Sequence, residues 1–107
     1  MLKYLALGLF FLCGVAEAAN IDDDLKNRVK FRANISAVAE WCGLDWAKRS
    51  FSPFMNKMRS AGYDNETISY IGTYHGVYMQ RKANELKGLV RACDSDVLQK
   101  LNKYLDK

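Results

Sequence analysis

Apolar residues recur at helical spacing through most of the chain after residue 20, and no segment alternates polar and apolar residues over more than a few positions. A recurrence at every third or fourth residue predicts amphipathic helices, whereas a half-buried strand needs a period of two. A single proline and the lack of repeats or low-complexity tracts favour one compact domain without linkers. We therefore predict an all-α fold, a small domain of four to five helices over residues 20–107.

The first predicted helix begins at the aspartates 22–24 and continues to Trp41, before Gly43. Carboxylates favour a helix N-terminus because they accept hydrogen bonds from its free N–H groups and carry the charge that the helix dipole stabilises there. The inward positions of this helix are expected to be Leu25, Val29, Phe31, Ile35, Val38, Ala39 and Cys42.

A second helix is predicted from Ser52 to Gly62, because a serine followed by a proline is typical of an N-cap with proline at the first helical position. Phe54 and Met58 would point inward from it. Residues 44–51 before it form either a short helix or a structured loop.

The longest helix is expected over residues 65–92, capped by Asp64. One of its faces collects the apolar positions together with the last cysteine, so the disulfide is expected to leave from this core-facing stripe. The stripe consists of Ile68, Gly72, His75, Met79, Leu86, Leu89, Val90 and Cys93. Asp94 or Ser95 would cap a last helix, with its inward side formed by Val97, Leu98, Leu101, Tyr104 and Leu105.

Residues 1–19 have the three-part pattern of a cleaved secretory signal, with Lys3, an apolar run over 5–12 and small residues at 16 and 18. The apolar run is too short to span a bilayer, so cleavage is expected after Ala18 or Ala19. The mature protein would then be secreted or periplasmic.

Two cysteines remain after Cys13 leaves with the signal. In an oxidising compartment the default for Cys42 and Cys93 is one intrachain disulfide. Closing a loop of about 50 residues stabilises a fold by roughly 4 kcal/mol in the chain-entropy model. Such a bond would be a large part of the stability of so small a domain.

The chain has 16 Lys and Arg against 12 Asp and Glu, a net charge of +4 that is scattered along the sequence. This mild excess attracts an anionic membrane surface at most weakly, and nucleic acid is not expected as a partner. Asn34 and Asn65 each begin an Asn-x-Ser/Thr triplet, which a glycosylating host could use.

Tyr70, Tyr74 and Tyr78 follow one another at four-residue intervals, with Arg81 next along the same helical strip. Tyrosine and arginine dominate binding hot spots, so this strip is the candidate partner surface. The alternative is that the rings flank the core and leave only their hydroxyls in water.

His75, the single histidine, lies between Gly72 and Gly76 and one turn before Met79. It is either a pH switch or a neutral core histidine that bonds a nearby carbonyl or the Cys42 end of the first helix. The two glycines each cost helix stability, so they serve either close packing or a ligand. Adding Met55 and Met58 would make a soft-metal site, but these residues are dispersed, and we predict no metal and no cofactor.

No catalytic constellation is visible, since one histidine with Ser69 or Thr73 forms no triad and no phosphate-binding loop occurs. We therefore expect a non-enzymatic exported helical protein that binds another exported or envelope protein. The alternative is a small-molecule or soft-metal binding protein that uses the Gly72/His75/Gly76/Met79 helix face.

In outline, a signal, two distant cysteines and helices resemble the small periplasmic acid-stress chaperones. The resemblance implies a chaperone-like, accessory role, and it assigns a function to no residue of this chain.

Overall fold

The structure is a computed structural model that describes residues 21–107, and in that range the chain forms four α-helices. Their bounds are α3 Asp23–Trp41, α4 Ser52–Ser60, α5 Asn65–Lys87 and α6 Ser95–Asn102, and a π-helical turn, η1 Ala47–Phe51, leads directly into α4. The predicted all-α fold is confirmed. The predicted signal, residues 1–19, lies outside the described residues, and among those described no helix is long and apolar enough to cross a membrane.

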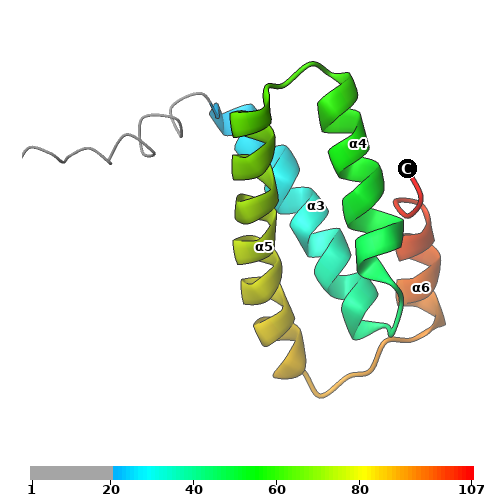
Figure 1. Cartoon of the computed structure of the whole chain (residues 1–107). Coiled ribbons are helices and arrows are strands. Elements are labelled where there is room, and N and C mark those ends of the chain that lie inside the picture. The colour runs from blue at the N-terminus through cyan, green and yellow to red at the C-terminus, as the bar shows by residue number, and fades with distance from the viewer. Residues whose placement is uncertain (1–20) are drawn as a thin grey trace, which may run out of the picture.

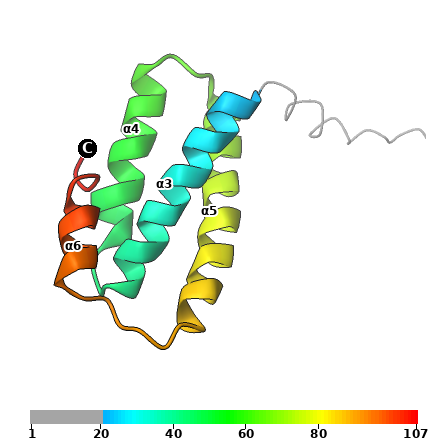
Figure 2. The ribbon, with the colours of Figure 1, turned by 180° about the vertical axis from the view of Figure 1, so that it is seen from behind.

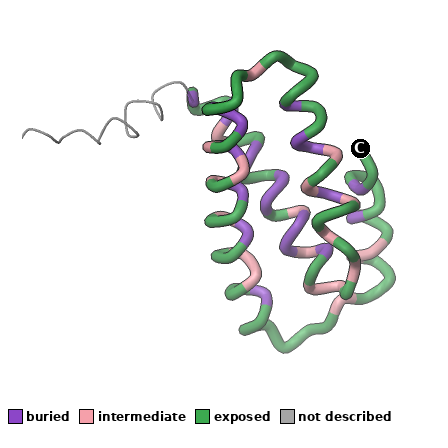
Figure 3. The backbone as a smooth tube through the Cα atoms, in the orientation of Figure 1, coloured by how far each residue is buried: buried purple, intermediate pink, exposed green. Residues whose placement is uncertain are grey.

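α3 is the central element of the fold. It runs between α5 on one side and α4 and α6 on the other, as the two opposite views show (Figures 1 and 2). Buried positions recur along the inner sides of the helices (Figure 3). Where α3, α4 and α5 meet, the core consists of Ile21, Leu25, Val29, Phe54, Met55, Met58, Ile68 and Ile71. Farther along α3, Ala33 and Ala37 pack against Met79 and Leu86 of α5, and Ala39 packs against Leu101 and Leu105 of the C-terminal segment.

Aspartates cap three of the helices, as the sequence predicts. Each accepts a hydrogen bond from the backbone N–H three residues later, which satisfies one of the free donors of the first turn. The pairs are Asp22 with Leu25 (2.8 Å), Asp64 with Thr67 (2.8 Å) and Asp94 with Val97 (3.0 Å).

The predicted N-cap at Ser52 is wrong. Its backbone is already helical (φ −61°, ψ −46°), and its side chain makes no cap bond. The helical path begins earlier, where Asp45 accepts a hydrogen bond from the backbone N–H of Lys48 at 3.1 Å. Residues 44–51, left open by the sequence, are thus mostly part of one helical run that continues into α4.

Pro53 is accommodated in this helical run by a contact from the far end of the chain. Proline has no N–H with which to bond the carbonyl four residues earlier, which is that of Arg49. The Arg49 carbonyl instead accepts the backbone N–H of Asp106 at 2.6 Å. The Ser52 N–H reaches back to the carbonyl of Ala47, the wider spacing that defines the π-helical turn.

α5 is shorter than predicted, since it ends at Lys87 and not near residue 92. Gly88 follows it, and the N–H groups of Gly88 and Leu89 make tighter bonds to carbonyls three residues back. Glycine is among the weakest helix formers, which favours an end at this point. Leu89 and Val90, predicted to face the core, are exposed, and Ile71 is fully buried although the predicted stripe omitted it.

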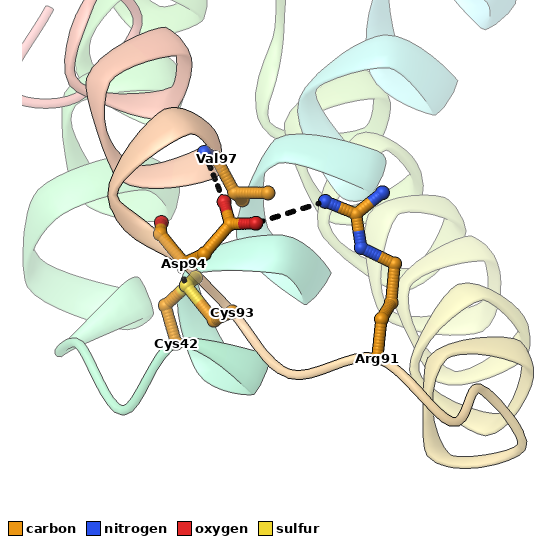
Figure 4. The surroundings of a disulfide bond; sticks show 5 residues. All are labelled: Cys42, Arg91, Cys93, Asp94 and Val97. Atoms are coloured by element: carbon orange, nitrogen blue, oxygen red, sulfur yellow. Dashed lines mark hydrogen bonds and ion pairs between the residues drawn. A yellow bond between two sulfur atoms is a disulfide. The ribbon is translucent and has the colours of Figure 1, made fainter.

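The predicted disulfide between Cys42 and Cys93 is confirmed, with the two Cα atoms 5.3 Å apart. It does not leave from α5, however. Cys93 lies in the segment before α6, so the bond ties the end of α3 to the start of α6 (Figure 4). Next to it, the carboxylate of Asp94 accepts a hydrogen bond from the Val97 N–H. The same carboxylate forms an ion pair with Arg91, whose Nη2 lies 3.4 Å from Oδ2.

Two predicted inward residues lie at the surface. Phe31 is 49 % exposed and Tyr104 39 %, and their rings meet edge to face with centroids 5.2 Å apart. Arg32, the neighbour of Phe31, is buried instead, with only 8 % of its surface exposed. Its guanidinium donates to the main-chain oxygens of Tyr104 (2.9 Å) and Lys107 (3.3 Å), contacts that depend on where the C-terminal segment lies.

Candidate functional site

The three tyrosines of the predicted strip form one connected group on α5. The rings of Tyr70 and Tyr74 stack with centroids 5.6 Å apart, and those of Tyr74 and Tyr78 meet edge to face at 4.5 Å. The hydroxyls of Tyr74 and Tyr78 are 2.8 Å apart and share a hydrogen bond. Four-residue spacing brings the rings together because residues i and i+4 are neighbours on a helix surface.

Two cations from different helices lie against the ring of Tyr78. The Nζ of Lys30, on α3, is 5.0 Å from the ring centroid, and the Cζ of Arg81 is 5.3 Å from it. Both distances are within the range of cation–π attraction. Sequence reasoning identified Arg81 but missed Lys30, because only the pairing of α3 with α5 places that lysine beside the strip.

A groove of about 310 Å³ lies at this point, lined by Lys30, Asn34, Tyr78, Arg81, Lys82 and Glu85. Glu85 and Lys82 form an ion pair, with Oε1 and Nζ 3.7 Å apart, and their charges offset each other. The net charge of the groove therefore comes from Lys30 and Arg81 and is positive. We call the surface formed by Tyr70, Tyr74, Tyr78, Arg81 and Lys30 the tyrosine face.

The electrostatics of the tyrosine face follow from its hydrogen bond. Bonding to Tyr78, with some burial, raises the pKa of Tyr74 to about 12. The pKa of Tyr78 is lowered, first by the bond that Tyr74 offers to its phenolate and then by Lys30, Arg81 and Lys26. With Tyr74 neutral, the face presents positive charge beside aromatic rings.

The rings of the tyrosine face are half-buried. Tyr70 and Tyr74 pack against the core shared by α3, α4 and α5, and Tyr78 packs against the alanine-lined contact of α3 and α5. The rings therefore flank the core, as one of the two interpretations expected, and their use as a partner surface stays a prediction. One side of each ring is fixed by the core, and the remainder is available at the surface.

His75 is buried, with 1 % of its surface exposed, and its partner is neither a carbonyl nor the Cys42 end of α3. Its Nε2 lies 2.8 Å from the hydroxyl of Ser36, which in turn lies 2.7 Å from the hydroxyl of Ser50. The rings of Trp46 and Phe51 cover it, with centroids 6.1 and 4.7 Å away. The two hydroxyls come from α3 and η1, and neither belongs to Ser69 or Thr73, the serine and threonine near His75 in the sequence.

Burial lowers the pKa of His75 to about 4, and the charge of Arg32 adds to the effect. The imidazole is therefore neutral at pH 7. Although Ser36 and His75 are at hydrogen-bond distance, neither Ser36 nor Ser50 has any exposed surface, so this pair cannot reach a substrate. The arrangement satisfies polar groups within the core and gives no nucleophile.

The Gly72/His75/Gly76/Met79 face is not gathered into one site. Gly72 faces α4 and η1, where a Cβ would meet Met55 and Phe51 at ordinary contact distances of 3.8 and 3.9 Å. Gly76 and Met79 instead line a groove of about 270 Å³ beside Trp46. Within residues 21–107, no group of three or more His, Cys, Asp or Glu side chains could hold a metal ion.

No protein-family model, no curated protein sequence and no solved structure matches this chain.

Proposed function

We propose that this protein is a non-enzymatic, exported helical binding protein, and that it contacts another exported or envelope protein through the tyrosine face. The observation that carries the proposal is the ring of Tyr78, which is flanked by Lys30 of α3 and Arg81 of α5. It unites aromatic surface with two cations that form no ion pair within residues 21–107.

Aromatic rings and arginine supply most of the binding energy in protein interfaces. Here the rings are held in place by stacking and by the bond between the Tyr74 and Tyr78 hydroxyls. A surface ordered before binding loses less conformational entropy when a partner docks. The charges of Lys30 and Arg81 favour a partner whose matching surface is acidic.

Two observations support export. The Cys42–Cys93 disulfide is of a kind that persists in oxidising compartments and is rare in a reducing cytosol. The pattern of residues 1–19 is that of a secretory signal.

The proposal is tested by photo-crosslinking in the compartment where the protein is found. A photoreactive phenylalanine analogue replaces Tyr70, at the edge of the tyrosine face, and in a control it replaces Tyr104, a partly exposed tyrosine on another face. We expect a discrete crosslinked product from position 70 and not from position 104.

Charge reversal then tests the role of the cations. The double variant K30E/R81E should lose the product, whereas K103E, which changes the charge of an exposed lysine elsewhere, should retain it. Raising NaCl from about 0.1 M to about 1 M should also weaken it, because the Debye length falls from about 10 Å to about 3 Å. Equal products from positions 70 and 104, or an unchanged product in K30E/R81E, would contradict the proposal.

A second candidate function is small-molecule binding beside Gly76. It is favoured by one observation, that no atom lies within 4 Å of where a Gly76 Cβ would be, in a groove that Met79 and Trp46 also line. A ligand there would raise the melting temperature of the wild type but not of G76L, in which a side chain fills the space. Copper(I), which the Met79 thioether could ligate, and a panel of small apolar compounds are suitable probes.

A further inference from the structure

A second concave surface lies on the opposite side of α3 from the tyrosine face. It is a groove of about 350 Å³ between α3 and α4, and both its walls and its charges come from these two helices. Phe31 and Phe54 supply aromatic surface, and Arg28, Arg32 and Lys57 supply positive charge. Its volume is at the lower end of the range for small-molecule sites, about 300–1,000 Å³.

Arg32 gives this groove a feature that ordinary surface grooves lack. Only 8 % of the surface of Arg32 is exposed, and its Cζ lies 5.7 Å from the centroid of the Phe54 ring. Of its five N–H groups, the two that are bonded within residues 21–107 donate to the main-chain oxygens of Tyr104 and Lys107. No carboxylate side chain of the described residues accepts a hydrogen bond from it, and its other N–H groups have no hydrogen-bond partner within residues 21–107.

The other charged residues of the groove increase the imbalance. Arg28 and Lys57 are exposed at its edges, one from each helix, and Asp24 is the single acidic residue that lines it. Three cations against one carboxylate, beside two phenylalanine rings, match a ligand that combines an anionic group with an apolar body. Guanidinium groups bind carboxylates through paired hydrogen bonds, so a carboxylate suits a groove that two arginines line.

We propose that the α3–α4 groove binds a small organic carboxylate with an aromatic or short aliphatic body. The carboxylate is held among Arg28, Arg32 and Lys57, and the body lies against Phe31 and Phe54. The site is separate from the tyrosine face and does not depend on the function proposed for that face, since the two share no residue.

The test is a titration followed by the backbone amide signals of the protein in two-dimensional NMR. The probe is 3-phenylpropionate, which has a carboxylate on a short aromatic body. It is compared with 3-phenylpropan-1-ol, which keeps the body without the charge, and with inorganic phosphate, which keeps the charge without the body. We expect saturable shifts from 3-phenylpropionate at α3 and α4 residues of the groove, and about tenfold weaker binding of each comparison compound.

Two matched variants locate the site. R28Q/K57Q removes the two exposed cations without touching the core, and we expect the affinity for 3-phenylpropionate to fall about tenfold. K48Q/K103Q makes the same change of charge at exposed lysines outside the groove and should bind as the wild type does.

Several results would overturn the proposal. Equal binding of the alcohol would show an apolar site, and equal binding of phosphate would show an unspecific anion site. Unchanged affinity in R28Q/K57Q, no saturable shift, or shifts centred on Lys30 and Arg81 would place no carboxylate in this groove.

Discussion

α5 and α6 both pack against α3, but they are held there by different means. α5 has 23 residues, and its buried positions follow α3 from Ile68 to Leu86. α6 has 8 residues, and of these only Leu101 is buried. A helix as short as α6 is not stable by itself in water, because nucleating a helix costs more than a few hydrogen bonds return.

Bonds at both ends compensate for the small contact area of α6. At its start, the disulfide joins Cys93 to Cys42 at the end of α3. After its end, Arg32 binds main-chain oxygens of the last residues, and Arg49 pairs with Asp106 at 2.9 Å. The comparison shows that one domain can stabilise a long helix by burying its apolar side chains, and a short helix by a disulfide, hydrogen bonds and an ion pair at its ends.

The largest expected effect comes from removing the disulfide between α3 and the start of α6. C42A/C93A should lower the free energy of unfolding by about 4 kcal/mol, because the loop of about 50 residues is no longer closed in the unfolded chain. Urea denaturation measures the loss. Hydrogen exchange should show that amides of α6 lose protection first while those of α5 keep theirs. Equal loss in both helices would mean that the disulfide supports the whole domain and not α6 in particular.

Acid should lower the free energy of unfolding through the contact between α3 and α5, where the buried histidine lies. His75 has a pKa of about 4 when folded against about 6.5 in an unfolded chain. Above pH 6.5 the imidazole is neutral in both states and its contribution is complete. As the pH falls from 6.5 to 4, the unfolded state binds a proton that the folded state excludes, so stability falls by about 3 kcal/mol.

Chemical denaturation at a series of pH values measures this dependence. The Ser36 hydroxyl lies at hydrogen-bond distance from Nε2 of His75, and the charge of Arg32 adds to the lowering of the His75 pKa. The pH dependence therefore arises where α3, η1 and α5 pack together. H75Q has no imidazole and should lose the dependence between pH 6.5 and about 5, keeping only the loss nearer pH 4 from Asp64, Asp94 and Asp106, whose pKa values are lowered. A dependence that persists in H75Q between pH 6.5 and about 5 would assign it to other groups.

The smallest expected effect concerns two glycines with open space around them. At Gly76, inside α5, alanine should raise the free energy of unfolding by up to about 1 kcal/mol, because alanine favours helix and its Cβ meets no atom within 4 Å. At Gly43 the same substitution should destabilise by about 1 kcal/mol, because φ is +78° there. Thermal denaturation of G76A and G43A measures both effects. Because both sites have open space, a difference in sign between the two variants reports backbone conformation and not packing. A destabilised G76A would show that α5 needs this glycine for a reason other than space.

Much of the fold could be predicted because its signals are local. A capping aspartate acts on the N–H three residues later, so Asp64 could be predicted from the sequence, and the other two caps could be narrowed to residues 22–24 and to Asp94 or Ser95. The spacing of Tyr70, Tyr74 and Tyr78 likewise placed three rings together, since neighbours on a helix surface follow from its geometry. The disulfide followed from the count of cysteines.

The errors have a common cause. Ser52 and Pro53 carry a convincing local start signal, but the chain was already helical from the Asp45 cap onward. A proline can lie inside that helical run because Asp106, far along the sequence, bonds the carbonyl that it leaves free. No local pattern contains that contact.

The sequence by itself determined where most of the described helices begin, that the regular structure of residues 21–107 is helical and that Cys42 pairs with Cys93. Only the tertiary structure decided that Lys30 joins the tyrosine face, that Ser36 is the partner of His75 and that Arg32 is buried. The physical reason is range. Capping and helical periodicity act within a few residues, whereas burial and charge pairing depend on which distant segment lies opposite, and that is settled only when the helices pack.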